Sequence, residues 1–515
     1  MQALMVDALG SAKGTRLLTR DVIGCGPRWV CGILERAGVS CRIQLCEDFL
    51  RSRKSDRTPD LLLVSAMTMD LPALRKIGRK ARNVVPGCRT VVGGPVCGSP
   101  RRALAASGFD LAVSGEGEDA LESILAGKDR DRIPGLSYRQ WDRVVVNPPA
   151  HRLDEQGYNR FSPSTRRIID YPTFFASRVY VEVVRGCSNF NRTRIRLADG
   201  RKCSECGKDC RHARCPEDIP PGCAFCSVPS TFGPPKSRRT DLVAKEVKEL
   251  VGLGVRKVVL SAPDLLDYCR GTDLVDPSSP RPNYPKIEDL LSSCKAAANG
   301  RARISIENVK PSLFDDEAAG IIAKHLPSTD VHIGCETGDE SHSSALGRPS
   351  TPLDSLRAVR IARKHGLRPY AYFIHGLPGQ TLDSARKTSQ LMHRMEPYVE
   401  KLTVYRFKPL PHSAFEGEPS GPPRWEDPAS NLIAEAAREI NLRKKDAYVG
   451  RTMEVIAAEP NMERRGDVFC FPVAGGPMVT VRGSKKLIGN RLNVKVTRAL
   501  SERLLAGEIV EVIRK

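Results

Sequence analysis

The sequence predicts an α/β protein in three parts along its 515 residues. Three observations support this prediction. Helix and strand patterns alternate through residues 1–130, which favours a doubly wound (Rossmann-like) domain. Six further strand-and-helix units fill residues 179–410, which favours a partial (β/α)6 barrel of the TIM type, because parallel units connect by right-handed crossovers. Short strands and turns fill residues 447–515, which indicates a small β-barrel.

The first part alternates apolar runs with amphipathic helices. We expect strands at 41–46, 60–65, 90–95 and 111–118, and helices at 27–37, 70–84, 101–106 and up to 126. The short apolar run at 60–65 is typical of a buried parallel strand. Open parallel sheets bind ligands at the carboxyl ends of their strands. The residues at those ends are Ser65, Gly93, Gly94, Gly115, Glu116 and Gly117.

The remaining elements follow in order. Residues 131–178, rich in Arg and Pro, are expected to connect the first two parts. The barrel strands are predicted at 179–184, 257–261, 302–307, 330–335, 369–374 and 402–407, and its helices at 241–251, 287–298, 315–325, 352–364 and 382–395. Residues 411–446 are expected to form a linker and a helix. The last part is expected to have strands at 453–457, 478–482, 491–496 and 509–513.

The cysteines are the strongest chemical signal. Seven of the 17 lie between residues 187 and 226, among Arg, Lys, Asp, Gly and Pro rather than on a periodic apolar face. Most free thiols are buried as small hydrophobes, and this setting does not fit that use. No secretory signal is apparent and the other cysteines are scattered, so we expect metal-bound thiolates rather than disulfides. The pair Cys223-x2-Cys226 can face one metal, and an insertion, residues 188–222, separates it from Cys187.

The insertion carries four cysteines of its own, in the pattern Cys203-x2-Cys206-x3-Cys210-x4-Cys215. This spacing suits either a closed, structural zinc site or a second iron–sulfur cluster, and zinc is preferred. The insertion has eight Lys and Arg residues against five Asp and Glu residues. A basic segment of this kind could guide an anionic substrate, whereas the plainer alternative is that the metal only stiffens the loop.

Residues 185–187 (Arg-Gly-Cys) and 223–229 (Cys-Ala-Phe-Cys-Ser-Val-Pro) resemble the cluster loop of radical S-adenosylmethionine (SAM) enzymes. In that family three closely spaced cysteines hold a 4Fe–4S cluster, whose fourth iron stays open for SAM. The resemblance implies that Cys187, Cys223 and Cys226 are the cluster ligands. The insertion after the first cysteine departs from the family pattern.

Other segments resemble the SAM-binding parts of the methylthiotransferase-like branch of that family. They are residues 261–264 and 307–308 at strand ends, the glutamate–glycine segment 333–338, the Gly-Arg segment 347–352, and the adenine-side turn 372–379. The resemblance implies that SAM is contacted by Phe225, Ser261, Pro263, Asp264, Glu307, Asn308, Glu336, Gly376 and Gly379.

Residues 15–127 resemble the cobalamin-binding-like domain that precedes the barrel of many radical enzymes. The resemblance rests on Pro59-Asp60 with Ser65 and on residues 92–95 and 115–118, and it implies that the six strand-end residues named above contact cobalamin. The first histidine of the chain is His151, so this domain offers no lower-ligand imidazole and cobalamin would bind base-off. A vestigial domain that binds nothing is the alternative.

Charge and the last part of the chain both point toward RNA. The formal net charge is +21, which suits a polyanionic partner. The alternative is that these charges are merely solvated, because the excess is spread along the chain. Residues 447–515, through Gly489 and residues 505–508, resemble the TRAM module that ends tRNA methylthiotransferases. We expect a cytoplasmic protein without a membrane partner, since no apolar run approaches a membrane span.

Together the resemblances imply an enzyme that methylates an unactivated carbon of RNA, such as tRNA, or of a protein. It would use a 4Fe–4S cluster, SAM and cobalamin, with a ferredoxin or flavodoxin as electron donor. Methylthiolation of tRNA is the alternative reaction, although the N-terminal auxiliary-cluster cysteines of that class are missing here. A non-catalytic RNA-binding iron–sulfur protein is the alternative of another class.

Overall fold

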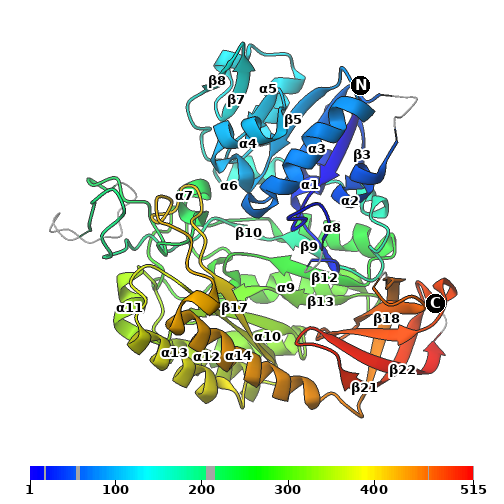
Figure 1. Cartoon of the computed structure of the whole chain (residues 1–515), viewed down its shortest axis with the longest axis vertical. Coiled ribbons are helices and arrows are strands. Elements are labelled where there is room, and N and C mark those ends of the chain that lie inside the picture. Colours follow the sequence, from blue (N-terminus) through cyan, green and yellow to red (C-terminus); the bar gives the residue numbers. More distant parts are fainter. Residues whose placement is uncertain (17–18, 54–57, 204–214, 462, 514–515) are drawn as a thin grey trace. The chain divides into compact units, whose positions relative to one another are not determined.

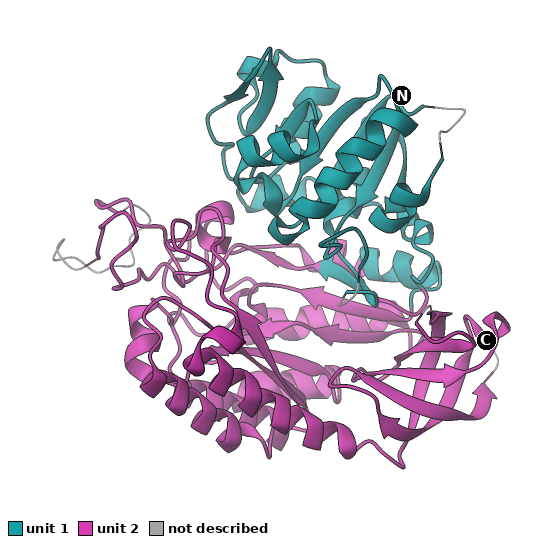
Figure 2. Cartoon of the chain, viewed as in Figure 1, with its two compact units in different colours: residues 1–174, 178–181, 245–255 teal, residues 175–177, 182–244, 256–515 magenta. Residues whose placement is uncertain are grey.

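The computed structural model describes the chain except for residues 17–18, 54–57, 204–214, 462 and 514–515 (Figure 1). Its contacts divide the chain into two compact units, coloured separately in Figure 2. Unit 1 comprises residues 1–174, 178–181 and 245–255, and unit 2 comprises residues 175–177, 182–244 and 256–515. In the described part of the chain, no helix is both long and apolar enough to cross a bilayer.

Unit 1 contains a seven-stranded sheet in the order β3-β1-β4-β5-β6-β7-β8. The first five strands of that order run parallel, and the last two pairings are antiparallel. The doubly wound prediction is therefore confirmed. The sequence analysis missed β1, although it lies between β3 and β4. The strands are β1 (Gln2–Asp7), β3 (Ser40–Leu45), β4 (Leu61–Ser65), β5 (Arg89–Gly93), β6 (Leu111–Val113), β7 (Leu136–Gln140) and β8 (Arg143–Val146).

The helices of unit 1 cover this sheet. Apolar residues of β4, such as Leu62 and Val64, share a buried core with Leu74 and Ile77 of α3. Burial of such side chains is the main term that favours folding. The helices are α1 (Gly26–Arg36), α2 (Cys46–Arg51), α3 (Leu71–Val84), α4 (Pro100–Ser107), α5 (Glu118–Leu125) and α6 (Glu155–Asn159).

Unit 2 contains the last five of the six strands predicted for the barrel, and most of the first lies in unit 1. Strand β12 pairs with β13 in parallel, and β14, β15, β16 and β17 form a second parallel sheet. Strand β9 (Arg178–Glu182), which begins in unit 1, pairs in parallel with β2 (Val22–Ile23) there. The parallel α/β prediction is confirmed. The strands of unit 2 are β12 (Lys257–Ser261), β13 (Arg303–Ile306), β14 (Asn308–Val309), β15 (Asp330–Glu336), β16 (Arg368–His375) and β17 (Lys401–Arg406).

Helices lie on one face of the second sheet. Alternate residues of β15 and β16, including Ile333 and Phe373, are buried, while the residues between them are half-exposed. This alternation follows from the two-residue period of a strand. The longer helices of unit 2 are α9 (Tyr284–Ala298), α10 (Asp316–His325), α12 (Pro352–Lys364), α13 (Leu382–Met395) and α14 (Pro428–Asp446), and α8 (Thr240–Gly252) begins in unit 2 and continues in unit 1.

The segment predicted as a linker and helix is packed into unit 2. Phe415 is fully buried, and its N–H donates to the Ala224 carbonyl at 3.0 Å. Asn441 of α14 bonds both the N–H and the carbonyl of Leu402 on β17. These contacts attach residues 411–446 to the parallel strands.

The last residues form a closed barrel in the order β18-β19-β20-β22-β21, as the sequence predicts. Its core contains Val455, Cys470, Val479, Leu492 and Leu505. The sequence analysis missed β19. The strands are β18 (Thr452–Pro460), β19 (Asp467–Pro472), β20 (Met478–Arg482), β21 (Arg491–Ala499) and β22 (Leu504–Ile513).

Gly78 fixes how two helices of unit 1 meet. A β-carbon at this position of α3 would lie 1.8 Å from the carbonyl oxygen of Ser107 at the end of α4. Glycine inside a helix costs about 1 kcal/mol relative to alanine. Its presence here is explained by the direct contact of the two backbones.

We expect Gly78→Ala to lower the free energy of unfolding by about 1–3 kcal/mol, because the helices must separate to admit the methyl group. Gly252→Ala is the matched control, since Gly252 is also helical and has no atom within 4 Å of its β-carbon position. The control should be neutral or stabilising. Urea denaturation followed by circular dichroism measures both, and equal midpoints would contradict this view of the α3–α4 contact.

Candidate iron–sulfur, SAM and cobalamin sites

A short antiparallel ladder brings the two ends of the cysteine-rich loop together. Strand β10 (Val184–Arg185) pairs with β11 (Lys236–Ser237), so residues 186–235 form one closed loop. The N–H of Val183 donates to the Ser261 carbonyl at the end of β12, at 2.8 Å. The long insertion therefore does not separate the first cysteine from the last two.

Gly186 allows the chain to turn within this ladder. Its φ is +91°, and a β-carbon would lie 2.3 Å from the Pro234 carbonyl oxygen. The next residue, Cys187, donates its N–H to the Gly233 carbonyl at 3.1 Å. Both the backbone conformation and the lack of space therefore require glycine before the first cysteine.

Asn189 links two of the three predicted cluster ligands. Its backbone N–H points to Cys187 Sγ at 3.4 Å, and its Nδ2 donates to Cys223 Sγ at 3.3 Å. Cys226 follows Cys223 in one tight turn, in which the Cys226 N–H donates to the Cys223 carbonyl at 2.8 Å. Burial is the main cause that raises the pKa of Cys187, and charge on Cys226 raises it further.

This donor set consists of three cysteine thiols. Among the described residues, no group of three His, Cys, Asp or Glu side chains is placed to hold a single metal ion. Three cysteine sulfurs in one loop fit an iron–sulfur cluster, which spreads its thiolate ligands over several iron atoms. Burial raises the pKa of Cys187 and of Cys226 to about 12, so these thiols stay protonated until metal binds.

A buried charge network anchors the residue after Cys187. Asp267 accepts bonds from the Ser188 N–H (3.1 Å) and hydroxyl (2.9 Å). Lys310 donates to the same hydroxyl at 2.7 Å, and Arg270 pairs with Asp267 at 2.6 Å. Burial favours protonated Asp267, but the charges of Lys310 and Arg270 outweigh it and lower its pKa. The sequence analysis missed this network.

Arg348 connects the cysteines with Glu336. Its Nη1 lies 3.6 Å from Cys223 Sγ and 3.4 Å from Glu336 Oε1. Glu336 is buried, which raises its pKa against the effect of Arg348. Its φ is +65°, and strained non-glycine backbone of this kind clusters at functional sites. Gly334 leaves room for the pair, because a β-carbon there would lie 2.7 Å from Glu336 Oε1.

The other predicted SAM residues divide into two groups. Ser261 donates its hydroxyl to Glu307 at 2.8 Å, and Asn308 donates to the Ala262 carbonyl at 3.3 Å, so these three side chains share the strand ends. Pro263 is exposed beside them. Asp264 is buried and pairs with Lys310 at 3.1 Å. The Asp264 carboxylate is thus already bound within the protein.

The other three predicted SAM residues, Phe225, Gly376 and Gly379, lie against other parts of unit 2. Phe225 is half-buried in an apolar cluster with Leu346 and Phe407. Gly376 has φ +73° and would place a β-carbon 2.8 Å from Gly421 Cα. A β-carbon on Gly379 would lie 3.2 Å from an Ile195 methyl group. The close approach at Gly376 and Gly379 is therefore explained by the chain itself.

Aromatic side chains line the half-exposed face of the second sheet. His332 lies 5.5 Å from Tyr370 and 5.4 Å from Tyr372, measured between ring centroids. Tyr372 stacks on Tyr405 at 6.1 Å, and 55% of Tyr405 is exposed. The sequence analysis did not select these rings, because each strand contributes only one or two of them.

Two of the four insertion cysteines can be placed. Cys203 is buried and Cys215 is half-buried, and both belong to the apolar cluster of Leu346 and Phe407. Cys206 and Cys210 lie outside the described residues. The structure therefore leaves both zinc and a second cluster as predictions.

The strand ends of unit 1 leave space for a cofactor. Ser65 and Gly93 are register partners at the ends of β4 and β5, and Gly94 follows with φ +88°. No atom lies within 4 Å of the β-carbon positions of Gly93 and Gly115. Such open glycines fit a bulky cofactor that approaches the backbone closely.

Glu116 and Gly117 differ from those open positions. The Glu116 carboxylate is buried and accepts the Leu153 N–H at 2.9 Å. A β-carbon on Gly117, which precedes α5, would lie 3.2 Å from Val113. Contacts within unit 1 therefore already account for both residues.

Comparison with known proteins finds two family models that match parts of this chain. The family model "Radical SAM superfamily" matches residues 212–392, and the model "B12 binding domain" matches residues 18–125. The first range contains Cys223 and Cys226 and begins after Cys187. The uncharacterized protein MJ1620 of Methanocaldococcus jannaschii is 41% identical over 515 residues, which cover 99% of each chain.

More distant proteins share part of the sequence or the fold. A tRNA-2-methylthio-N(6)-dimethylallyladenosine synthase of Sulfurihydrogenibium sp. is 24% identical over 56% of this chain and 63% of its own. The radical SAM methyltransferase TsrM of Kitasatospora setae, with tryptophan and a SAM analogue bound, superposes with a TM-score of 0.57 at 16% identity, over 80% of this chain and 74% of its own.

The chain therefore belongs to the radical SAM superfamily, in a family shared with MJ1620, and carries a B12-binding domain ahead of its radical SAM domain. A 4Fe–4S cluster, SAM and cobalamin are the cofactors of such a chain, as the sequence analysis predicts.

We expect Lys310→Met to lower the free energy of unfolding by about 3 kcal/mol or more, because it leaves the buried Asp264 without its cation and Asp267 with Arg270 alone. Lys324→Met is the matched control, since Lys324 pairs with Glu288 at 2.6 Å but is 67% exposed. Exposed pairs contribute at most about 1 kcal/mol. The urea denaturation midpoints of the two variants measure this difference. Equal shifts of the midpoint would show that the buried ion pairs of Lys310 do not stabilise the fold more than an exposed pair does.

Proposed function

We propose that this protein is a cobalamin-dependent radical SAM methyltransferase that modifies an unactivated carbon of RNA or of a protein. The observation that carries the proposal is one chain with three grouped thiols in its radical SAM domain and open strand-end glycines in its B12-binding domain. The likeness to TsrM, a methyltransferase whose structure holds cobalamin and a [4Fe–4S] cluster, supports it.

The cluster ligands in this proposal are Cys187, Cys223 and Cys226, and the strand-end residues of unit 1 hold cobalamin. When bound, a reduced cluster would supply one electron to SAM, and cobalamin would supply the methyl group. Asn189 and Arg348 donate to sulfur, which stabilises charge on the cluster ligands. Arg348 also holds Glu336 at the SAM side, and the stacked rings of Tyr372 and Tyr405 offer an apolar surface to a planar substrate group.

The RNA branch of the proposal is supported by charge. The C-terminal barrel has the closed form of a small nucleic-acid-binding module, and residues 471–515 contain nine Lys and Arg against three Asp and Glu. We therefore include in the proposal that this barrel, like a TRAM module, contacts the RNA substrate.

Methylthiolation of tRNA is the second candidate reaction. It is favoured by the similarity to a tRNA methylthio synthase and by the four insertion cysteines, which could hold a second cluster. Iron counts discriminate between the two reactions. A reconstituted protein that loses iron when Cys203 and Cys206 are replaced would favour methylthiolation, and one that loses zinc would favour methylation.

Replacing Cys223 or Cys226 with alanine should abolish the visible absorbance of the reconstituted cluster, because the two remaining thiolates would hold only two of its four irons. Cys88→Ala is the control, since the Cys88 thiol lies in unit 1 and donates to the backbone carbonyl of Arg89. Retained absorbance in both ligand variants would refute the ligand assignment.

Anaerobic incubation with SAM and a reductant tests the reaction class. We expect cleavage of SAM and, after reconstitution with cobalamin, one bound cobalamin per chain. Mass spectrometry of nucleosides and peptides from cells with and without the gene then identifies the methylated molecule. Cleavage of SAM without any cobalamin bound would contradict the methyltransferase and leave sulfur insertion.

A further inference from the structure

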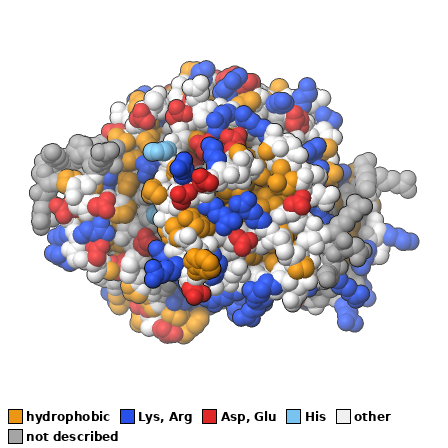
Figure 3. Space-filling view, turned by 90° about the horizontal axis from the view of Figure 1, so that it is seen from above, with side chains coloured by type: hydrophobic (Ala, Val, Ile, Leu, Met, Phe, Trp, Pro, Cys, Tyr) orange, Lys and Arg blue, Asp and Glu red, His pale blue; other side chains and the backbone are white. Residues whose placement is uncertain are grey.

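Helix α3 has an unusual charge distribution. Its sequence, LPALRKIGRKARNV, contains five Lys and Arg residues and no Asp or Glu, and the neighbouring α4 adds Arg101 and Arg102, also without an acidic residue. On the face drawn in Figure 3, Lys and Arg side chains lie among Asp and Glu side chains. The two helices therefore form a basic surface within unit 1.

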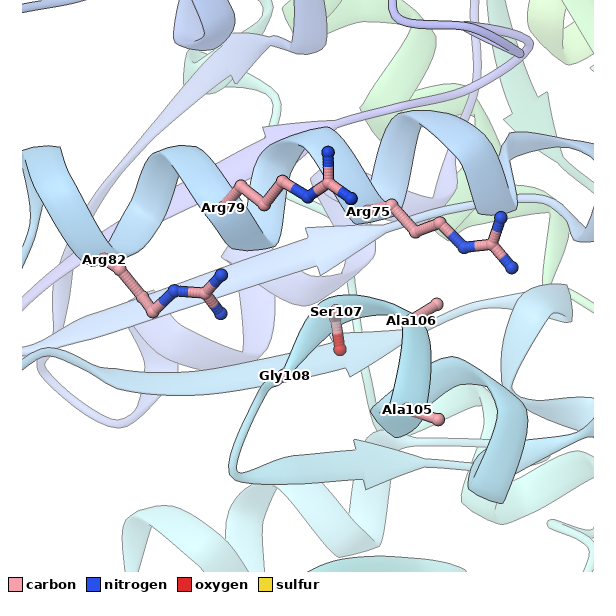
Figure 4. A pocket seen from close by; sticks show the side chains of 7 residues that line it. All are labelled: Arg75, Arg79, Arg82, Ala105, Ala106, Ser107 and Gly108. Carbon is pink, nitrogen blue, oxygen red and sulfur yellow. The ribbon is translucent and has the colours of Figure 1, made fainter.

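Three arginines of α3 line one cavity. Arg75, Arg79 and Arg82 border a cavity of about 280 Å³ whose other wall is Ala105–Gly108 at the end of α4. Figure 4 shows their side chains leaving α3 beside that turn. A β-carbon on Gly108 would lie 3.1 Å from Arg82 Nη1. At a rise of about 1.5 Å per residue, the three positions are spaced about 6 and 4.5 Å along the helix.

The close contact at Gly78 builds this cavity. Gly78 lies between Arg75 and Arg79 and lets the α3 backbone rest on the Ser107 carbonyl. A bulkier residue would move the arginines away from the end of α4. The same feature that fixes helix packing thus sets the spacing between the guanidinium groups and the wall of small residues.

The three arginines have no partner within the described part of the chain. All three are exposed, and none takes part in a hydrogen bond or an ion pair there. By contrast, Arg51 and Arg160 of the same unit pair with carboxylates. Uncompensated, adjacent positive charges repel one another, so an anion that bridges them would be bound favourably.

We propose that the surface formed by Arg75, Arg79 and Arg82 with α4 binds the phosphate backbone of RNA. The proposal rests on the proposed function only in taking RNA as the substrate, and it identifies a second contact region apart from the C-terminal barrel. Guanidinium groups bind phosphate oxygens in a bidentate manner, and a row of three matches a chain of repeated charges better than a single ion.

The lining of the cavity favours RNA over an acidic protein. Its non-arginine wall consists of Ala105, Ala106, Ser107 and Gly108. The centres of protein interfaces are enriched in aromatic side chains and Met, and the lining of this cavity contains neither. Without aromatic rings the contacts are to phosphate and carry no base specificity.

The test is the salt dependence of RNA binding by the full-length protein. The probe is a fluorescently labelled oligouridylate, titrated at several salt concentrations. Three variants are compared with the unmodified chain: Arg75→Gln/Arg79→Gln/Arg82→Gln, the same three positions changed to Lys, and the control Lys128→Gln/Arg132→Gln/Arg143→Gln. The control removes the same charge from exposed positions of unit 1.

The glutamine variant should bind about tenfold more weakly or worse, and its slope of log K against log salt should fall by about 2, since each single-strand phosphate contact contributes about 0.7. The lysine variant should keep most of the slope, and the control should keep both affinity and slope. Equal losses in the control would overturn the site and leave only a net-charge effect. Equal competition by polyglutamate would overturn the choice of RNA.

Cleavage of SAM separates this proposal from the proposed function. Binding of the oligouridylate needs neither the cluster nor cobalamin. Absence of SAM cleavage in the unmodified protein would therefore refute the enzyme and leave the surface standing. Normal SAM cleavage with unchanged RNA binding in the glutamine variant would refute the surface and leave the enzyme standing.

Discussion

The two-residue ladder between β10 and β11 is the constraint on which the rest of the site depends. It closes a loop of 50 residues between Arg185 and Lys236, and it works only because Gly186 admits the carbonyls of Gly233 and Pro234 beside it. A long insertion is tolerated because the cost of closing a loop grows slowly with its length. The cysteines can therefore share one site although 35 residues separate the first from the second.

The ends of several strands then hold this loop in place. Ser188, next to the first cysteine, is bound by Asp267 after β12 and by Lys310 after β14, and Cys223 is bound by Arg348 after β15. Parallel strands place their carboxyl ends on one edge, so a loop that leaves one strand meets the segments that follow the others. The charges balance locally: buried carboxylates face buried cations, and cations lie beside the sulfurs.

Much of the fold could be predicted because buried parallel strands are short apolar runs: residues 60–65 were predicted and β4 is Leu61–Ser65. Strand β1 was missed, since no turn signal precedes it. The cysteine ligands could be predicted from their flanking residues. The network of Lys310, Asp267 and Ser188 could not, because its partners are 43 and 79 residues apart. Glu116 was predicted to contact cobalamin, but its carboxylate binds Leu153, and no local pattern reveals that bond.

The central claim is that three thiols of one loop hold a cluster whose remaining iron is open to SAM. Electron paramagnetic resonance of the reduced, reconstituted protein with and without SAM tests it most directly. The account predicts that SAM changes the g-values of the cluster signal, because SAM would bind an iron directly. A signal identical with and without SAM would contradict an open iron and with it the assignment of Cys187, Cys223 and Cys226 as a catalytic site.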